Sequence, residues 1–221
     1  MKSFQTAITA AFLSISAVGA AHAALLDFTD STGWISKSSP TFDVGEISGK
    51  LTADGGSLNF TPFDGTSDDV SSDLYAHDSS DAWDGIGIQD DEIGDTEQLT
   101  ITFNSSVNVS RIDFLDLFKK TGGAESILVT AFKGENQLHS ETFTGNVFEA
   151  AGTGYFSGTT AFNGIDRLVF SYLDGNDTSG IGDAALAAVQ VSAVPIPAAL
   201  PLFASALAGL GFVGYRRRRN A

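Results

Sequence analysis

The feature that most limits the possible folds is a two-residue alternation of apolar and polar side chains through the middle of the chain. The segments 57–63, 98–103 and 166–173 alternate in this way, with Gly, Asn, Asp and Ser between them. Side chains of a β-strand point alternately to opposite faces, so this spacing predicts half-buried strands rather than helices. We expect about nine or ten strands between Leu25 and Ala193, as in a sandwich.

One long apolar segment changes its alternation part-way. Val107 and Val109 share one parity, whereas Ile112 and Phe114 share the other. A strand can change parity without losing its buried face only if it takes in an extra residue. The pattern therefore predicts a β-bulge or a bend near Ser110–Arg111.

Two further segments complete the expected fold. Residues 127–143 are predicted to form a hairpin with its turn at 133–136, and the alanine-rich segment 184–194 is predicted to be the last strand. The predicted fold class is all-β: a single β-sandwich of jelly-roll type covering residues 24–193. An N-terminal signal peptide and a C-terminal transmembrane sorting helix are expected to flank it.

The first 23 residues have the three parts of a secretory signal peptide. Lys2 supplies the positive charge, 7–18 is the apolar run, and Ala21-His22-Ala23 is a small-x-small cleavage site. Cleavage is expected after Ala23. An uncleaved anchor helix is the alternative, but the apolar run is short for a membrane span.

Charge is distributed very unevenly along the chain. Lys2 and Arg216 to Arg219 are five of the 12 basic residues, and all 27 acidic residues lie between Asp27 and Asp183. The central segment therefore keeps seven basic residues and has a net charge of −20. Such a field repels nucleic acid and attracts cations, so no nucleic-acid partner is expected.

The C-terminal segment can span a membrane. Val194 to Tyr215 are 22 uncharged residues, and Arg216, Arg217, Arg218 and Arg219 follow directly. About 20 apolar residues cross a bilayer as a helix, and arginines stay on the cytoplasmic side. The sequence alone allows an ordinary membrane anchor with the body exported.

The order of these parts resembles a known sorting signal. Val194, Pro195, Ile196, Pro197 and Ala198, then the span, then the terminal arginines, resemble the C-terminal signal of the PEP-CTERM family in its VPxPA variant. Ile196 stands where the prototype has Glu. The prolines disfavour helix and keep this motif extended, which suits an enzyme cleft.

The resemblance implies an exported protein of a Gram-negative bacterium. It implies transient anchoring in the inner membrane, processing by an exosortase-type transpeptidase, and transfer to the cell surface or extracellular matrix. It also implies a structural or adhesive role with exopolysaccharide, as in a biofilm.

The central segment includes a dense acidic stretch. Twelve carboxylates lie between Asp64 and Glu97, with no Lys or Arg between Lys50 and Arg111. Ca²⁺ takes six to eight oxygen ligands, so a Ca²⁺ site is one interpretation and a solvated acidic surface is the other. The candidate ligands are Asp90, Asp91, Glu92, Asp95, Glu97 and, from a distance, Asp183.

Several enzyme classes are disfavoured. The chain has no cysteine and three histidines, one of them in the predicted signal peptide, so thiol catalysis is excluded and a three-histidine zinc site is not expected. We expect a non-enzymatic protein. A carbohydrate-binding module, with Trp34, Tyr75 or Trp83 stacking on sugars, is the alternative, and a polysaccharide-acting enzyme is less favoured.

Overall fold

The computed structural model describes residues 23–32, 40–89, 92–148, 152–173 and 184–194, together with a few residues between 203 and 218. The chain divides into two compact units, and one of them, Ala21–Val194, is called the body below. Residues 1–22 of the predicted signal peptide and Pro195–Ala198 of the predicted sorting motif Val194–Ala198 lie outside the described residues. In the second unit, Phe203, 205–210, Tyr215 and Arg218 are helical.

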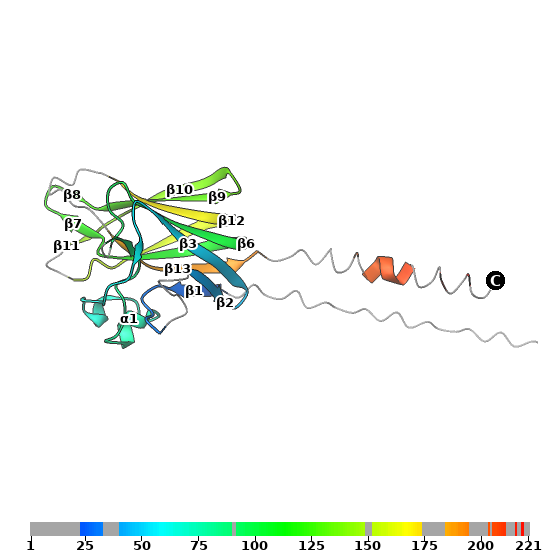
Figure 1. Ribbon diagram of the computed structural model, residues 1–221, viewed down its shortest axis with the longest axis horizontal. Coiled ribbons are helices and arrows are strands. Elements are labelled where there is room, and N and C mark those ends of the chain that lie inside the picture. Colours follow the sequence, from blue (N-terminus) through cyan, green and yellow to red (C-terminus); the bar gives the residue numbers. More distant parts are fainter. Residues whose placement is uncertain are drawn as a thin grey trace, which may run out of the picture. The chain divides into compact units, whose positions relative to one another are not determined.

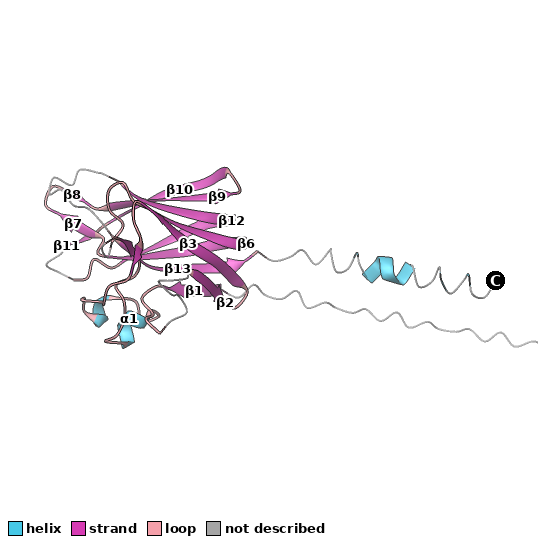
Figure 2. Cartoon of the chain, viewed as in Figure 1, coloured by secondary structure: helices cyan, strands magenta, loops and turns pink. Residues whose placement is uncertain are grey.

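The described part of the body is all-β and mainly antiparallel (Figure 2). Eight strands form its main sheet. They are β1 (Ala23–Asp27), β2 (Thr41–Val44), β3 (Ile47–Asp54), β6 (Gln98–Leu115), β9 (Ser126–Lys133), β10 (Asn136–Thr144), β12 (Phe156–Tyr172) and β13 (Ala185–Ala193). Smaller pairings involve β4 (Leu58–Asn59) with β5 (Gly87–Ile88), and β7 (Phe118–Lys120) with β8 (Gly123–Ala124) and β11 (Val147–Phe148).

Two long strands, β6 and β12, run through the centre of the sheet (Figure 1). The first half of β6 pairs with β3 and its second half pairs with β13. Strand β12 lies antiparallel to β6 over most of its length and pairs with β9 through its last residues. The order of the main path is β1-β13-β6-β12-β9-β10.

The parity change in β6 coincides with a register shift against both neighbours. Opposite β13, Arg111 pairs with Gln190 and Val109 pairs with Val191, which leaves Ser110 as an extra residue. The pairing with β12 shifts at the same place. The predicted bulge is confirmed, and it keeps Val109 and Ile112 on the buried side of one strand.

The main core takes its side chains from nearly every strand of this sheet. Leu26 of β1, Leu51 of β3, Val129 of β9 and Leu168 of β12 are all fully buried in it. The predicted hairpin is also confirmed, since β9 and β10 are antiparallel neighbours, with one register shift between Gln137 and His139, and Gly134 at their turn has a φ of 57°. A left-handed residue at this position is what a tight hairpin turn requires.

A second, smaller core lies under the segment between β4 and β5. This segment contains the short helices η1 (Ser67–Asp69) and α1 (Tyr75–Asp78). Its Val70 and Leu74 pack against Leu115 and against alanines of β13. Because β13 is buried on both faces, small residues on one face allow this segment to approach closely, which explains its alanine-rich sequence.

The structure departs from the sequence pattern at residues 57–63. Only Leu58–Asn59 form a strand there, and Pro62 makes an isolated bridge to Trp83. Proline lacks the amide hydrogen that a longer ladder would need, so the predicted strand is cut short.

Among the described residues, no helix has both the length and the apolar character needed to cross a membrane.

Candidate functional site

The acidic loop between β5 and β6 is closed by its own side chains. Glu97 is 8 % exposed, and its Oε1 accepts a hydrogen bond from Nε2 of Gln89 at 3.0 Å. Its Oε2 accepts one from the backbone N–H of Gly94 at 2.9 Å. Gln89 also donates to the carbonyl of Gly55. Glu97 therefore holds the two ends of the loop together.

Two residues of this loop adopt left-handed backbone angles. Gln89 has a φ of 64° and Thr96 a φ of 66°. The β-branched Thr96 is unusual in this region and is held there by the surrounding hydrogen bonds. The sequence carried no signal for this closure beyond the acidic residues themselves.

The described candidates for Ca²⁺ do not form a cluster. Glu92 is half-buried and Asp95 is exposed, whereas Glu97 is engaged as described above. Within the described ranges, no group of three or more His, Asp or Glu side chains is arranged to hold a metal ion. Asp90, Asp91 and Asp183 lie outside those ranges.

One contact does bring distant candidate segments together. The backbone N–H of Ile93 donates to the carbonyl of Ala184 at 2.9 Å, and the N–H of Ile88 donates to the carbonyl of Glu92 at 2.8 Å. The acidic loop is thus joined to the residue that follows Asp183 in the chain. A Ca²⁺ site here stays a prediction.

An ion-pair cluster that the sequence reasoning missed joins β6 to the segment with η1 and α1. Arg111 Nη2 lies 2.7 Å from Asp73 Oδ2, and its Nε lies 3.0 Å from Asp113 Oδ2. Ser157 donates to the other oxygen of Asp113 at 2.6 Å. No Lys or Arg lies between Lys50 and Arg111, and the residues between them are rich in carboxylates. This isolated positive charge was the feature of the sequence that could have predicted an ion pair at Arg111.

Burial and charge shift the two carboxyl groups of this cluster in opposite directions. The side chain of Asp113 is fully buried, and this burial raises its pKa despite the bond from Ser157 and the charge of Arg111. Partial burial alone would raise the pKa of Asp73 too, but hydrogen bonds from Ser71 and Arg111 outweigh it and lower that pKa. The cluster anchors the segment to the sheet.

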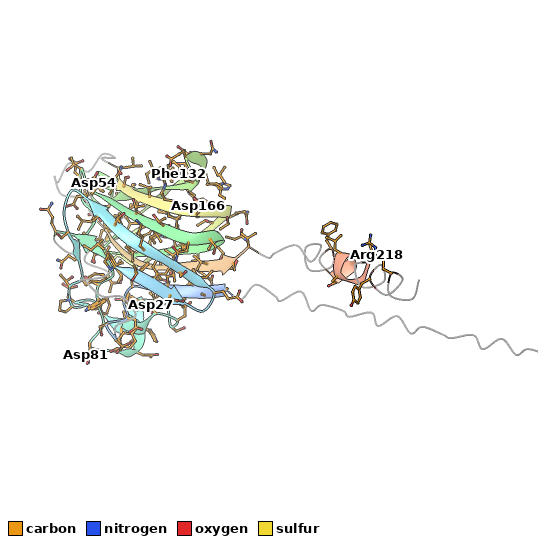
Figure 3. All side chains as sticks on the ribbon, turned by 45° about the vertical axis from the view of Figure 1, so that its right-hand side comes forward. Asp27, Asp54, Asp81, Phe132, Asp166 and Arg218 are labelled. Carbon is orange, nitrogen blue, oxygen red and sulfur yellow. The ribbon has the colours of Figure 1, made fainter. Side chains whose placement is uncertain are left out.

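Asp27, at the end of β1, is a second anchor for the same segment (Figure 3). Its Oδ1 accepts hydrogen bonds from the N–H and the hydroxyl of Thr29, and its Oδ2 accepts one from the N–H of Tyr75 at 2.7 Å. The hydroxyl of Thr29 in turn accepts from the N–H of Ala76. Burial raises the pKa of Asp27.

Comparisons with protein-family models, with curated proteins and with solved structures give no match.

The aromatic residues considered for sugar stacking are packed into the body where they are described. The rings of Trp83 and Phe60 lie 4.6 Å apart between centroids. Tyr75 is half-buried against the second core, and Trp34 lies outside the described residues. Trp83, like Tyr75, is half-buried, and sugar stacking by either residue stays a prediction.

A polar hollow of about 550 Å³ opens beside the segment with η1. Asp64 and Asp69 of that segment, Asp116 after β6, and Thr153 line it. No motif of the sequence indicated this hollow.

The last strand of the body ends directly before Val194, the first residue of the predicted sorting motif. Strand β13 ends at Ala193, and Val194 makes one more backbone hydrogen bond, to the carbonyl of Ser106 at 3.3 Å. At the other terminus, Ala23 of the predicted cleavage site pairs with Ser192. Ala21 and the residues from Pro195 to Ala198 lie outside the described residues, and Arg218 is exposed.

Proposed function

We propose that this chain is an exported cell-surface or matrix protein whose C-terminal segment is a removable membrane handle, processed at the Pro195–Ala198 motif by an exosortase-type transpeptidase. The observation that carries the proposal is the boundary of the body. Ala21–Val194 forms one compact unit, and the residues from Pro195 onward belong to the other unit, as do residues 1–20. Cleavage after Ala23 and within the proline motif would leave every described strand in place, and β1 would lose only its first residue.

The pairing of β1 with β13 supports the same function. Ala23 lies opposite Ser192, so both ends of the body meet at one end of this strand pair. Removal of the leader after Ala23 would leave four residues of β1 paired to β13. The folded body can therefore form before the tail is cut, because its last strand is complete at Ala193.

The helical residues of the second unit also fit a lipid environment. Phe203, Leu207, Leu210 and Tyr215 are all more than half exposed. Apolar side chains exposed in this way are stabilised by a bilayer, and the neighbouring arginines suit its cytoplasmic face.

For the body we propose a β-sandwich of jelly-roll type with a structural or adhesive role in an exopolysaccharide layer. Strands from both ends of the main sheet contribute to one core, as the two layers of a sandwich do. The described histidines lend no support to an enzyme. His77 bonds the carbonyl of Ser67, and His139 stacks on Phe162.

The test is the intact mass of the mature protein from cells with and without the exosortase. We expect a released form that begins at Ala24 and ends near the proline motif only when the enzyme is present. A matched control replaces Arg216 to Arg219 with glutamine, which should weaken retention in the membrane without altering the body. A mature form that keeps residues 195–221 in both strains and stays in the inner membrane would show that the segment is an ordinary anchor.

A further inference from the structure

Strand β10 forms one margin of the main sheet (Figure 1). Among the described strands it pairs only with β9, so alternate N–H and C=O groups along its other edge point away from the sheet. No described backbone group outside β9 bonds to this strand. Six of its nine residues are exposed. An open edge of this kind is a template for a further strand.

This edge is longer and less protected than the other margins of the sheet. Strands β1 and β2, which end the other branches, have five and four residues, whereas β10 has nine. Proteins block edge strands by keeping them short or by placing lysine or proline on them. Strand β10 contains no lysine, arginine or proline. Its one bulge leaves His139 to Thr144 in regular register with β9, so that six residues remain available for pairing.

The hairpin of β9 and β10 carries far less charge than the acidic stretch of the body. Between Ser126 and Thr144 there are one cation, Lys133, and two carboxylates, Glu135 and Glu141, which gives a net charge of −1. The stretch 64–97 has twelve carboxylates and no Lys or Arg. Two copies of so acidic a body repel each other, and the repulsion is weakest where the facing surfaces carry the least charge. A second copy therefore approaches most easily at β10.

The side chains of β10 are complementary to those of a second β10 in the antiparallel direction. A two-fold axis at Ser140 places His139 of each copy opposite Glu141 of the other. An imidazole N–H can donate to a carboxylate in either protonation state of the ring, and such cross-strand pairs stabilise a sheet. The ring of His139 is already held on this face, because it stacks on Phe162 with 5.3 Å between centroids.

The opposite face of β10 gains an apolar contact from the same pairing. Leu138 is 46 % exposed, although it lies within a strand. The axis at Ser140 places it opposite Thr142 of the second copy, whose methyl group it can contact. Burial of this apolar surface and pairing of the open backbone edge act together.

We propose that two copies of this chain associate through β10, antiparallel about Ser140, so that their main sheets join into one. Each copy contributes the same residues to this contact, so it is isologous and closes at two chains. The inference goes beyond the proposed function and does not depend on removal of the tail. A two-fold assembly presents every surface of the body twice, which suits a protein that joins polymers in a matrix.

Cross-linking tests the position of the axis. The chain has no cysteine, so a single introduced thiol reports on one contact between copies. Purified full-length Ser140→Cys, in a mild detergent, is treated with a short bis-maleimide and analysed on a denaturing gel. We expect rapid formation of a linked dimer, because the axis places the two Cβ atoms about 4.5–5.5 Å apart. The matched control is Ser105→Cys, an exposed serine of β6, which should remain a single chain.

Sedimentation of the full chain, with the solvent density matched to the detergent, measures association independently. We expect the mass of two chains. Ser140→Lys should weaken association by about tenfold or more, because it places two like charges directly opposite each other. Thr52→Lys, at an exposed residue of β3, changes the net charge equally and should leave association unchanged. Both variants should keep the melting temperature, since both positions are exposed.

Three outcomes would overturn the proposal. The mass of a single chain at every concentration tested would mean that β10 does not pair. Association that Ser140→Lys retains in full would mean that another surface, such as the apolar tail, joins the chains. Cross-linking of Ser105→Cys as fast as that of Ser140→Cys would mean that the thiols meet by random collision.

Discussion

Glu97 illustrates, at the scale of single residues, how this chain uses a carboxylate from its most acidic stretch. Its two oxygens accept hydrogen bonds from Gln89 and Gly94, and the side chain is almost buried. The loop it closes includes two left-handed residues, Gln89 and Thr96. At least one carboxylate of this acidic stretch therefore stabilises the fold through hydrogen bonds, in addition to making the surface soluble.

We predict that Glu97→Gln destabilises the full chain by about 2 kcal/mol, because its amide group can accept only one of the two bonds and turns a donor toward another donor. Urea unfolding followed by tryptophan fluorescence measures this loss. The control is Glu135→Gln, whose side chain is 95 % exposed and should change stability by less than about 0.5 kcal/mol. Equal effects of the two substitutions would contradict the role of Glu97.

The strand β6 is the element on which the main sheet depends. It pairs with β3, β12 and β13, and the extra residue Ser110 reverses its alternation between Val109 and Ile112. One strand can thus serve two parts of the sheet and keep its apolar side chains in the core.

Deletion of Ser110 should abolish folding, because it moves the side chains on one side of the bulge to the opposite face of the sheet. Circular dichroism and yield of soluble chain in detergent measure the effect. Ser110→Ala, which keeps the extra residue, should fold normally since Ser110 is exposed. A folded deletion variant would mean that the bulge does not set the register.

The segment with η1 and α1 depends on the cluster at Arg111. Arg111→Met should cost about 3–5 kcal/mol at pH 7, because it leaves Asp113 buried without its ion partner. The loss should shrink toward acid pH, where the buried carboxyl group takes up a proton. Lys133→Met, at an ion pair with Asp166 that is partly exposed, should cost about 1 kcal/mol or less. A loss that is equally large at pH 5 and pH 8 would exclude this explanation.

At the scale of the whole molecule, the negative net charge and the buried carboxyl groups both make the folded state less stable as pH rises. Burial raises the pKa values of Asp27 and Asp113 in the folded state. Folding therefore favours proton uptake between their unfolded and folded pKa values, and stability falls as pH rises through that window. The net charge of −20 on the central segment, which the arginines near the C-terminus and Lys2 reduce to −15 for the whole chain, adds repulsion at neutral pH.

We predict a higher melting temperature at pH 5 than at pH 8, measured on the full chain in detergent. The opposite contribution, from the lowered pKa of Asp73, is lost only as pH falls below its unfolded value of 3.8. Asp113→Asn should make the dependence between pH 5 and pH 8 shallower. A melting temperature that declines steadily from pH 8 to pH 5 would contradict this account.

The sequence by itself determined the all-β class, the hairpin at Gly134, the bulge at Ser110 and the last strand. These features are local, because the side-chain period of a strand and the backbone demands of a turn are set by neighbouring residues. The motif at Val194–Ala198 is equally local, and its sorting role stays a prediction.

Only the tertiary structure decided how segments far apart in the chain combine. The predicted strand 57–63 ends at Asn59 in the structure. The segment that follows it is held to the sheet by Asp27 and Arg111. Thr153 lies beside Asp64 and Asp69, although it is far from them in the sequence. The cost of burying a charge or a hydroxyl group depends on which partners the fold supplies, and those partners lie 38 to 48 positions away for the two anchors. No local pattern of residues encodes that pairing.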